Sequence, residues 1–319
     1  MLKKYLPIFL LLGFIVILFK DMFFYDKVPL PGDTLIGAYF PWLDYKWGFS
    51  VGVPVKNPPT SDAFSQFFVW KKVLTDTLKE GRLPLWNHTS FTGAPLMASF
   101  HSSALNPANI FFFLPKIGWG IYIFSSFISA TLAMYLYLSL WTKDSKSKSI
   151  GAIVYALSGP MSTWAEFGTA VWAAAFFPLF FYSIHQFVIT HKKKYVFCTP
   201  ISLCLLIFSG HVQIATYALF LLPFYLLYLM RFYKPSTTII LKTILFVFLG
   251  LGLAAIQLLP TKEYLTRSIR AEEKYAATFN YGLSPIDQIV RFWAADFYGH
   301  PTNRNHFSEV SYHEYSTFL

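Results

Sequence analysis

Residues 117–141 read IGWGIYIFSSFISATLAMYLYLSLW and contain no Asp, Glu, Lys or Arg. A helix that crosses a bilayer needs roughly 20 apolar residues, because each residue rises about 1.5 Å through a hydrocarbon core of about 30 Å. This stretch meets that requirement, and the basic segment 143–148 follows it directly. The pattern predicts a transmembrane helix that ends at a membrane surface.

The composition of the whole chain agrees with a membrane protein. The 319 residues are 55% hydrophobic and 20% aromatic, and only 13% are charged. These values exclude an ordinary soluble domain and a disordered chain. The chain has two cysteines, Cys198 and Cys204, and both lie in an apolar stretch. They exclude a disulfide-stapled secreted domain and are expected to be unpaired packing residues.

Working outward from residues 117–141, the other apolar runs predict six further spans. These are residues 5–24, two helices within 149–190 that turn near 162–168, two within 195–230 that break at Ser209-Gly210, and residues 239–260. The expected fold is an all-α polytopic membrane protein with about seven transmembrane helices. No small-x-small cleavage site follows the first run, so an uncleaved anchor is preferred over the alternative, a signal peptide.

The net charge of +10 is concentrated in the short connections between apolar runs. These connections hold eleven basic residues and one acid, Asp144. The basic residues are Lys3, Lys4, Lys143, Lys146, Lys148, Lys192, Lys193, Lys194, Arg231, Lys234 and Lys242. Basic loops face the cytoplasm in membrane proteins, so the N-terminus is expected to be cytoplasmic, in a bacterial inner membrane. The charge therefore gives no reason to expect nucleic acid as a partner.

The spans divide the chain into four parts. Residues 1–24 form the first helix, 25–116 an extracytoplasmic loop with surface helices, 117–262 a six-helix region, and 263–319 a second extracytoplasmic loop. The first loop is too long to be a simple connection and is expected to carry structure or function. Within it, apolar residues at helical spacing predict a surface helix over residues 65–80. The chain is expected to be a fragment of a longer protein.

Carboxylates beside the membrane are the main candidates for chemistry. Asp33 and Asp62 lie in the first extracytoplasmic loop, where an acid can meet a lipid-linked substrate. His211 and Gln213 lie at the junction of two spans, where polar groups face a wet cavity or cap a helix turn. Glu166 lies in a predicted turn and either pairs with a base or is solvated.

The late loop is rich in polar residues that could bind a metal. It contains Asp296, His300, Asn303, Asn305, His306, Glu309, His313 and Glu314. Their spacing matches no zinc signature, so a polar loop is favoured and no metal ligand is assigned. The sequence also lacks a Walker-type phosphate loop, a Rossmann fingerprint and a Gly-x-Ser-x-Gly elbow.

Several motifs taken together resemble bacterial YfhO-like membrane proteins. They are PGD at 31–33, YFPW at 39–42, SDAFSQF at 61–67, EGRLPLWN at 80–87, FTGAPL at 91–96, GHVQ at 210–213, QLLPT at 257–261 and DFYGHP at 296–301. The resemblance covers nearly the whole chain in order. His88 and His300 depart from it, where proline and asparagine are expected. Family members are usually longer, which agrees with a truncated chain.

The resemblance implies a GT-C-like fold, that of polytopic glycosyltransferases whose donor is a sugar on a polyprenyl-phosphate carrier. It implies that Asp33, or as second choice Asp62, is the catalytic carboxylate. It also implies that substrate is held by His211, Gln213, Arg270, Trp86 and Asn87. No covalently bound cofactor is expected, and the need for a divalent metal stays open. The implied partners are membrane lipid, the lipid-linked sugar and an envelope glycopolymer or glycolipid acceptor.

Two other functions remain as alternatives. A transporter or flippase for a lipid-linked envelope precursor would need charged or broken helices near the midplane, and the predicted spans are nearly free of charge. A scaffold whose loop only binds partners would tolerate neutral replacements of its acids. The sequence favours the glycosyltransferase over both.

Overall fold

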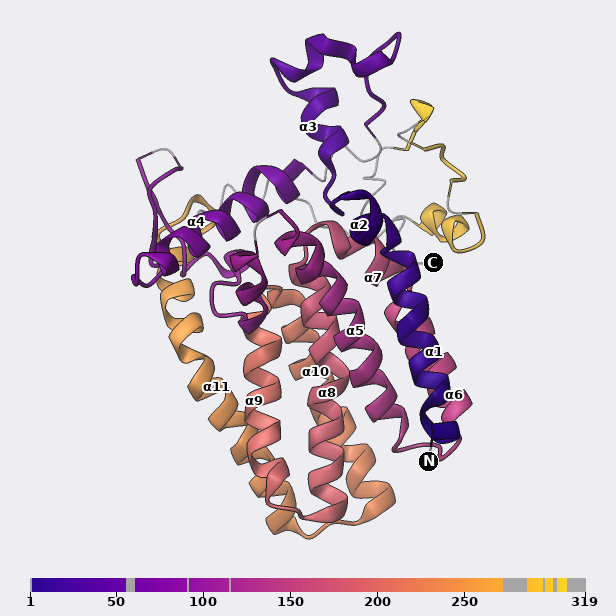
Figure 1. Ribbon diagram of the computed structural model, residues 1–319. Helices are drawn as coiled ribbons and strands as arrows, with labels where there is room; N and C mark the ends of the chain where they lie inside the picture. Colours follow the sequence, from indigo (N-terminus) through magenta and orange to yellow (C-terminus); the bar gives the residue numbers. More distant parts are fainter. Residues whose placement is uncertain are drawn as a thin grey trace.

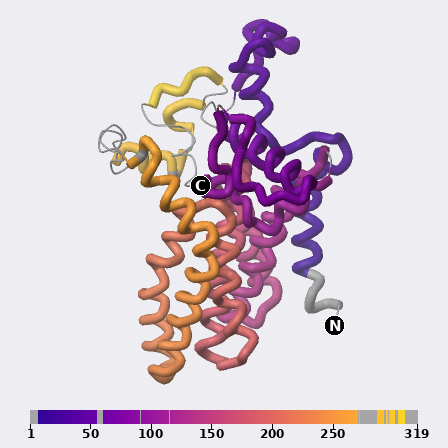
Figure 2. Tube along the Cα trace, turned by 90° about the vertical axis from the view of Figure 1, so that its left-hand side faces the viewer, coloured from indigo at the N-terminus to yellow at the C-terminus, as the bar shows by residue number. Residues whose placement is uncertain are grey.

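The computed structural model describes residues 2–55, 61–90, 92–114, 116–271, 286–294, 296–300 and 303–308. It consists mostly of helices, which form a bundle with a layer of shorter elements at one end (Figures 1 and 2). We call that end the loop end and the elements on it the loop layer. The opposite end carries the N-terminus (Figure 1).

The bundle helices lie where the apolar runs predict them. They are α1 (Leu2–Leu18), α2 (Lys20–Tyr25), α5 (Gly118–Leu138), α6 (Ser145–Ala156), α7 (Gly159–Thr163), α8 (Thr169–Thr190), α9 (Lys194–Phe208), α10 (Val212–Tyr233) and α11 (Thr237–Thr266). α5 packs between α6 and α8, α8 packs on α9 and α10, and α9 packs on α11. α1 lies against α6 and α5 at the edge of the bundle.

Four of these helices, α5, α8, α10 and α11, are long and apolar enough to cross a membrane. The other predicted spans are helical but shorter than predicted. The first is divided at Phe19 into α1 and α2, and the third ends at Ala156, followed by the short α7. α9 has 15 residues. Seven full crossings therefore stay a prediction, while four candidate spans are present in the described structure.

The helix ends follow the local sequence signals. The predicted break at Ser209-Gly210 is confirmed, because α9 ends at Phe208 and Gly210 has a φ of +84°. A side chain at Gly210 would also collide with Ser103, since a Cβ there would lie 2.6 Å from the Cβ of Ser103. Only glycine combines this backbone conformation with so close an approach.

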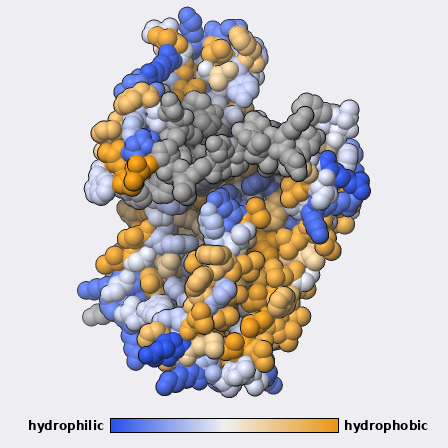
Figure 3. Space-filling view, turned by 180° about the vertical axis from the view of Figure 1, so that it is seen from behind, coloured by the Kyte–Doolittle hydropathy of each residue, from blue (hydrophilic) through white to orange (hydrophobic). Residues whose placement is uncertain are grey.

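The outward sides of the bundle are apolar. Large side chains such as Phe220 of α10 and Phe248 of α11 are about two-thirds exposed, at 66% and 65%. Apolar residues cover much of the side seen in Figure 3, and hydrophilic ones gather toward the ends. Exposed apolar surface of this extent fits contact with lipid acyl chains. Both cysteines are unpaired, as predicted, but only Cys204 is buried in the packing, and the prediction that Cys198 is a packing residue is wrong because its side chain is exposed.

The basic connections lie at the end opposite the loop layer. The segments between α5 and α6, α8 and α9, and α10 and α11 all turn at that end, which also holds the N-terminus (Figure 1). The arrangement follows from the alternating directions of the helices. It brings the positive charges between the spans to one side of the bundle, as the positive-inside rule requires.

The loop layer is built mainly from the first long connection. Its elements are α3 (Gly32–Ala38), η1 (Trp42–Gly48), η3 (Ala63–Phe68), α4 (Val69–Lys79), β1 (Trp86–Asn87), β2 (Ala94–Pro95), η4 (Phe100–Ser102) and η5 (Pro107–Phe113). η3 is a π-helical turn that leads into α4, in agreement with the predicted helix at 65–80. β1 and β2 form a small antiparallel ladder. α4 lies across the end of the bundle (Figure 1).

Lys71 of α4 joins the parts of this layer. Its side chain is 1% exposed, and its Nζ donates hydrogen bonds to the main-chain oxygen of Ser102 at 3.0 Å and to Oδ1 of Asn109 at 2.7 Å. It also donates to Oγ of Ser103. The Nζ lies 5.1 Å from the ring centre of Tyr122 in α5. One amine thus connects α4, η4 and η5 and lies beside α5, one of the four candidate membrane spans.

We expect Lys71→Met to destabilise the folded chain. Methionine keeps the apolar stem but leaves buried acceptors at Ser102 and Asn109 without their donor, which costs about 1–3 kcal/mol for each buried group. Thermal unfolding of the detergent-solubilised protein measures the change. Lys72→Met is the matched control, because Lys72 is exposed and its ion pair contributes at most ~1 kcal/mol. Equal losses in the two variants would contradict the assigned role.

The destabilisation is expected to depend on pH. Burial lowers the pKa of Lys71 from 10.5 to about 7. Between pH 7 and 10 the unfolded chain therefore binds a proton that the folded chain does not, so stability rises with pH across this range. Lys71→Met lacks this contribution, and the stability gap between wild type and variant should widen from pH 7 to pH 10. A constant or narrowing gap would contradict the lowered pKa.

Candidate functional site

A cavity of about 370 Å³ opens at the loop end of the bundle. We call it the loop-end cavity. Its lining comes from four segments of the sequence: Gln66 and Trp70 before and in α4, residues 98–101, Val212 at the start of α10, and residues 261–269 at and just after the end of α11. Polar groups such as Ser99, His101 and Ser268 share the lining with aromatic and aliphatic side chains. This mixture suits a ligand that has both hydroxyl groups and apolar surface.

Two polar side chains of α11 fix one wall of the cavity. Nε2 of Gln257 donates to the main-chain oxygen of Met97 at 2.7 Å, and Oγ1 of Thr261 donates to that of Ala98 at 2.9 Å. Gln257 also donates to Thr261 at 3.0 Å, since residues i and i+4 share one helix face. These bonds attach α11 to the segment that lines the cavity. Their positions match the QLLPT motif at 257–261.

Two histidines meet beside the cavity. The ring of His211, which precedes α10, lies 5.9 Å from that of His101 and 5.5 Å from that of Trp164. Burial, together with the neighbouring His101, lowers the pKa of His211 to about 4. His211 is therefore neutral near pH 7 and suits a hydrogen bond to a hydroxyl better than the charge of a phosphate. Glu166 ends the neighbouring short helix η6 (Trp164–Glu166).

Asp62 is connected to the cavity through one hydrogen bond. It precedes the π-helical turn η3, and its Oδ1 accepts from Nε2 of Gln66 at 2.7 Å. Gln66 lines the cavity, whereas Asp62 itself is exposed. Isolated π-helical turns often occur at functional sites. The carboxylate of Asp62 thus lies one side chain away from the cavity.

Asp33 lies on a different part of the loop layer. It is half-buried in the first turn of α3, and Pro29, just before that helix, accepts a hydrogen bond from Nε1 of Trp119 at 2.9 Å. The lining of the loop-end cavity does not include Asp33. The far end of α3 approaches η3, because the rings of Tyr39 and Phe64 lie 5.5 Å apart. Its catalytic role stays a prediction.

Gln213 and Arg270, two of the predicted substrate-binding residues, lie in different elements. Gln213 is exposed in the first turn of α10, and its Nε2 donates to the hydroxyl of Tyr217 at 2.6 Å. Arg270 follows Ile269, which lines the cavity, but its side chain lies outside the described residues. Gln213 and His211 therefore adjoin the same end of α10, while a contact between Arg270 and a phosphate stays a prediction.

Trp86 and Asn87 lie in the β1 strand, where their contacts are those of a loop scaffold. Asn87 is 1% exposed, and its Oδ1 accepts from the backbone N–H of Thr89 at 2.9 Å while its Nδ2 donates to Oγ of Ser90 at 2.8 Å. Trp86 is partly exposed and packs beside Gly93. Neither residue lines the loop-end cavity. Trp86 and Asn87 therefore do not share a cavity with His101 and Gln66, and their role in binding substrate stays a prediction.

The late loop gives no metal site within the described residues. There, no group of three or more His, Cys, Asp or Glu lies together. Asp296, His300 and His306 are described, whereas Glu309, His313 and Glu314 lie outside the described residues. Oδ1 of Asn305 accepts from the backbone N–H of His300 at 2.9 Å, a contact that shapes a turn.

Sequence reasoning missed several of the residues that form the site. His101 and Lys71 lie in no motif that predicts a site, and Trp70 lies on the predicted surface helix without a predicted role in binding. Gln257 and Thr261 had a usable signal, because two polar residues four apart in a long apolar helix predict a polar contact on one face.

Four membrane-length helices, an apolar belt and a cavity at one end define the class, a polytopic helical membrane protein. Residues 55–304 match the family described as bacterial membrane protein YfhO. The match covers more than half of the chain, so the chain belongs to this family. Asp62, His211 and Arg270 lie within the matched residues, and Asp33 precedes them. No curated protein and no solved structure matches the chain.

We expect Thr261→Val to loosen the cavity wall formed by α11. Valine keeps the shape of threonine but removes the hydrogen bond to Ala98, and losing a typical hydrogen bond costs about 1 kcal/mol. Thermal unfolding should show the loss. Thr266→Val is the control, because its hydroxyl bonds only within its own helix, to the oxygen of Glu263. An unchanged unfolding temperature in Thr261→Val would contradict a stabilising role for the hydrogen bond between Thr261 and Ala98.

Proposed function

We propose that this YfhO-family protein is a membrane glycosyltransferase that moves a sugar from a polyprenyl-phosphate carrier to an envelope glycopolymer or glycolipid. The observation that carries the proposal is the loop-end cavity, which joins polar groups to the rim of an apolar helical bundle. A lipid-linked sugar likewise has a polar part, its sugar, and an apolar part, its polyprenyl chain. The proposal extends to a GT-C-like fold, with seven spans in the membrane.

The helices beside the cavity suit the lipid part of such a donor. Val212 of α10 and Leu265 of α11 line the cavity, and both helices expose large apolar side chains along their length. A polyprenyl chain lying along these helices would stay in the bilayer while its phosphate and sugar reach the cavity. Trp70 and Tyr264 offer aromatic surface for a sugar ring. No nucleotide needs to bind for this chemistry.

The polar groups near the cavity suit an inverting transfer. One carboxylate removes the proton from the acceptor hydroxyl as that oxygen attacks the anomeric carbon, and the lipid phosphate leaves from the opposite side. Asp62 accepts a hydrogen bond from Gln66, which lines the cavity, and Asp33 is the acid that the resemblance favours. His211, neutral at pH 7, is suited to hold a sugar hydroxyl. Arg270 is suited to the leaving phosphate.

The position of the cavity favours transfer over transport. A flippase or transporter is expected to bind its substrate near the bilayer midplane, at broken helices with charged groups. The loop-end cavity instead opens at one end of the bundle.

We expect the carboxylate replacements to abolish transfer. Asp62→Asn and Asp33→Asn are expressed separately, as full-length protein, in cells that lack the gene, and envelope glycans and lipid-linked sugars are compared by mass spectrometry. Loss of a catalytic base lowers the rate by about 10²–10⁴-fold, so the essential variant should lack one sugar substituent and accumulate its lipid donor. Asp44→Asn, a loop-layer acid of η1, is the control and should restore the glycan.

The outcomes separate the possibilities. Failure of Asp62→Asn alone would assign the base to Asp62, and failure of Asp33→Asn alone would assign it to Asp33. Full rescue by the double variant would contradict the transferase mechanism. An unchanged glycan profile in cells without the gene would contradict the transferase itself.

We expect the loop layer to face away from the cytoplasm, in the bacterial inner membrane. In a variant with Cys198 and Cys204 replaced by alanine, a cysteine at the exposed His88 should react with an impermeant maleimide in intact cells. A cysteine at Lys193, in the basic connection before α9, should react only after the cells are opened. The reverse labelling pattern would overturn the topology.

A further inference from the structure

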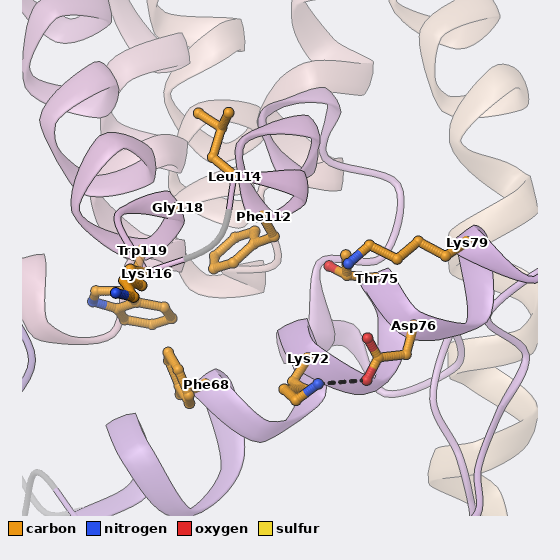
Figure 4. Close-up of a pocket in the computed structure, with 10 residues that line it drawn as sticks. All are labelled: Phe68, Lys72, Thr75, Asp76, Lys79, Phe112, Leu114, Lys116, Gly118 and Trp119. Carbon is orange, nitrogen blue, oxygen red and sulfur yellow. Dashed lines mark hydrogen bonds and ion pairs between the residues drawn. The ribbon is translucent and has the colours of Figure 1, made fainter.

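A second cavity, of about 280 Å³, lies between α4 and the start of α5 (Figure 4). We call it the lysine pocket. It shares no lining residue with the loop-end cavity. Three lysines line it, Lys72 and Lys79 from α4 and Lys116 from the segment before α5. The mechanism proposed above uses none of them.

The pocket has an excess of positive charge. Asp76 is the one acid in its lining, and it pairs with Lys72 at 2.7 Å (Figure 4). Both side chains of this pair are largely exposed, at 68% and 48%, so the pair is weak and Lys72 can interact with a second anion. Within the described part of the chain, Lys79 and Lys116 form no ion pair. An anion in the pocket would therefore meet two unneutralised ammonium groups.

The start of α5 adds to this charge. α5 has 21 residues and begins at Gly118, and no side chain caps its N-terminus. A helix N-terminus carries roughly half a positive charge and directs backbone N–H groups outward. The start is held in place because Gly118 packs against η5, where an added Cβ would lie 2.6 Å from the main-chain oxygen of Phe111. The helix end and the lysines thus meet at one pocket.

The aromatic residues that line the pocket lie around the start of a candidate membrane span, near the surface of the membrane. The rings of Phe68 and Trp119 meet edge to face with centres 5.7 Å apart, and the ring centre of Phe112 lies 5.9 Å from that of Trp119. Trp119 is in the first turn of a helix that is long enough to cross the membrane. Trp119 itself is buried, at 2% exposed, so the start of this helix gives the level of the pocket, and lysines at the boundary between lipid and water attract anionic headgroups.

We propose that the lysine pocket binds the phosphate headgroup of an anionic phospholipid. The cavity is slightly smaller than the roughly 300–1,000 Å³ of pockets for drug-sized ligands, which suits a headgroup whose acyl chains remain outside. The lysines and the start of α5 hold the phosphate, while Phe68, Phe112 and Trp119 cover the glycerol and the first methylene groups. This apolar cover favours a lipid over free phosphate. The site is independent of the proposed sugar transfer.

The test measures lipid binding to the purified full chain by native mass spectrometry. The protein in nonionic detergent is titrated with phosphatidylglycerol, with phosphatidylcholine and with inorganic phosphate. The variant Lys72→Ala, Lys79→Ala, Lys116→Ala should bind phosphatidylglycerol at least about tenfold more weakly, since each replacement removes an ammonium group from the pocket, and one such group beside an anionic headgroup contributes several-fold in affinity. Lys20→Ala, Lys27→Ala, Lys262→Ala removes the same charge from residues that do not line the pocket and should stay within about twofold of wild type.

A third variant guards against misfolding. Replacing the three pocket lysines by arginine keeps the charge and should retain the affinity for phosphatidylglycerol. Equal weakening in the pocket and control variants would overturn the proposal, because binding would then follow overall charge. Equal binding of phosphatidylcholine would overturn the choice of an anionic lipid. Inorganic phosphate that displaces the lipid at matched concentration would overturn the lipid as ligand in favour of free phosphate.

Discussion

A buried amine that pairs with no carboxylate among the described residues, that of Lys71, stabilises the loop end of this protein. Burying Lys71 costs free energy, which appears as the fall of its pKa to about 7. Hydrogen bonds to the main chain at Ser102 and to Asn109 offset this cost. Because these partners lie 31 and 38 residues further along the chain, the bonds fix the path of a segment that has little regular structure of its own. These bonds tie α4 to η4 and η5 at the end of the bundle.

The loop-end cavity depends on that fixed path. The segment held by Lys71 also packs against Gly210, which brings His101 beside His211, and the preceding residues accept bonds from Gln257 and Thr261. The cavity therefore forms where a polar layer, a break between two helices and the end of a third meet. Such a position, at the rim of an apolar bundle, is where the head of a lipid-linked substrate and a polar acceptor can come together.

The sequence predicted the features that depend on local pattern. The uncharged run at 117–141 forms α5. The chain breaks between α9 and α10 at Ser209-Gly210, because Gly210 has a positive φ and leaves no room for a Cβ beside Ser103. Helix length was predicted less well, since apolar composition continues beyond Ala156 while the helix ends there. Contacts between residues far apart in the sequence could not be predicted. Nothing near Lys71 indicates that it is buried, and Gln257 meets Met97 across 160 residues.

The central claim is that the loop-end cavity receives a lipid-linked sugar, and hydrogen–deuterium exchange of the full chain tests it most directly. A short-chain polyprenyl-phosphate hexose should slow exchange in residues 66–70, 97–103 and 261–269, and the same carrier phosphate without its sugar should protect them less. Protection confined to other parts of the chain, or equal protection by the sugar-free carrier, would contradict the claim.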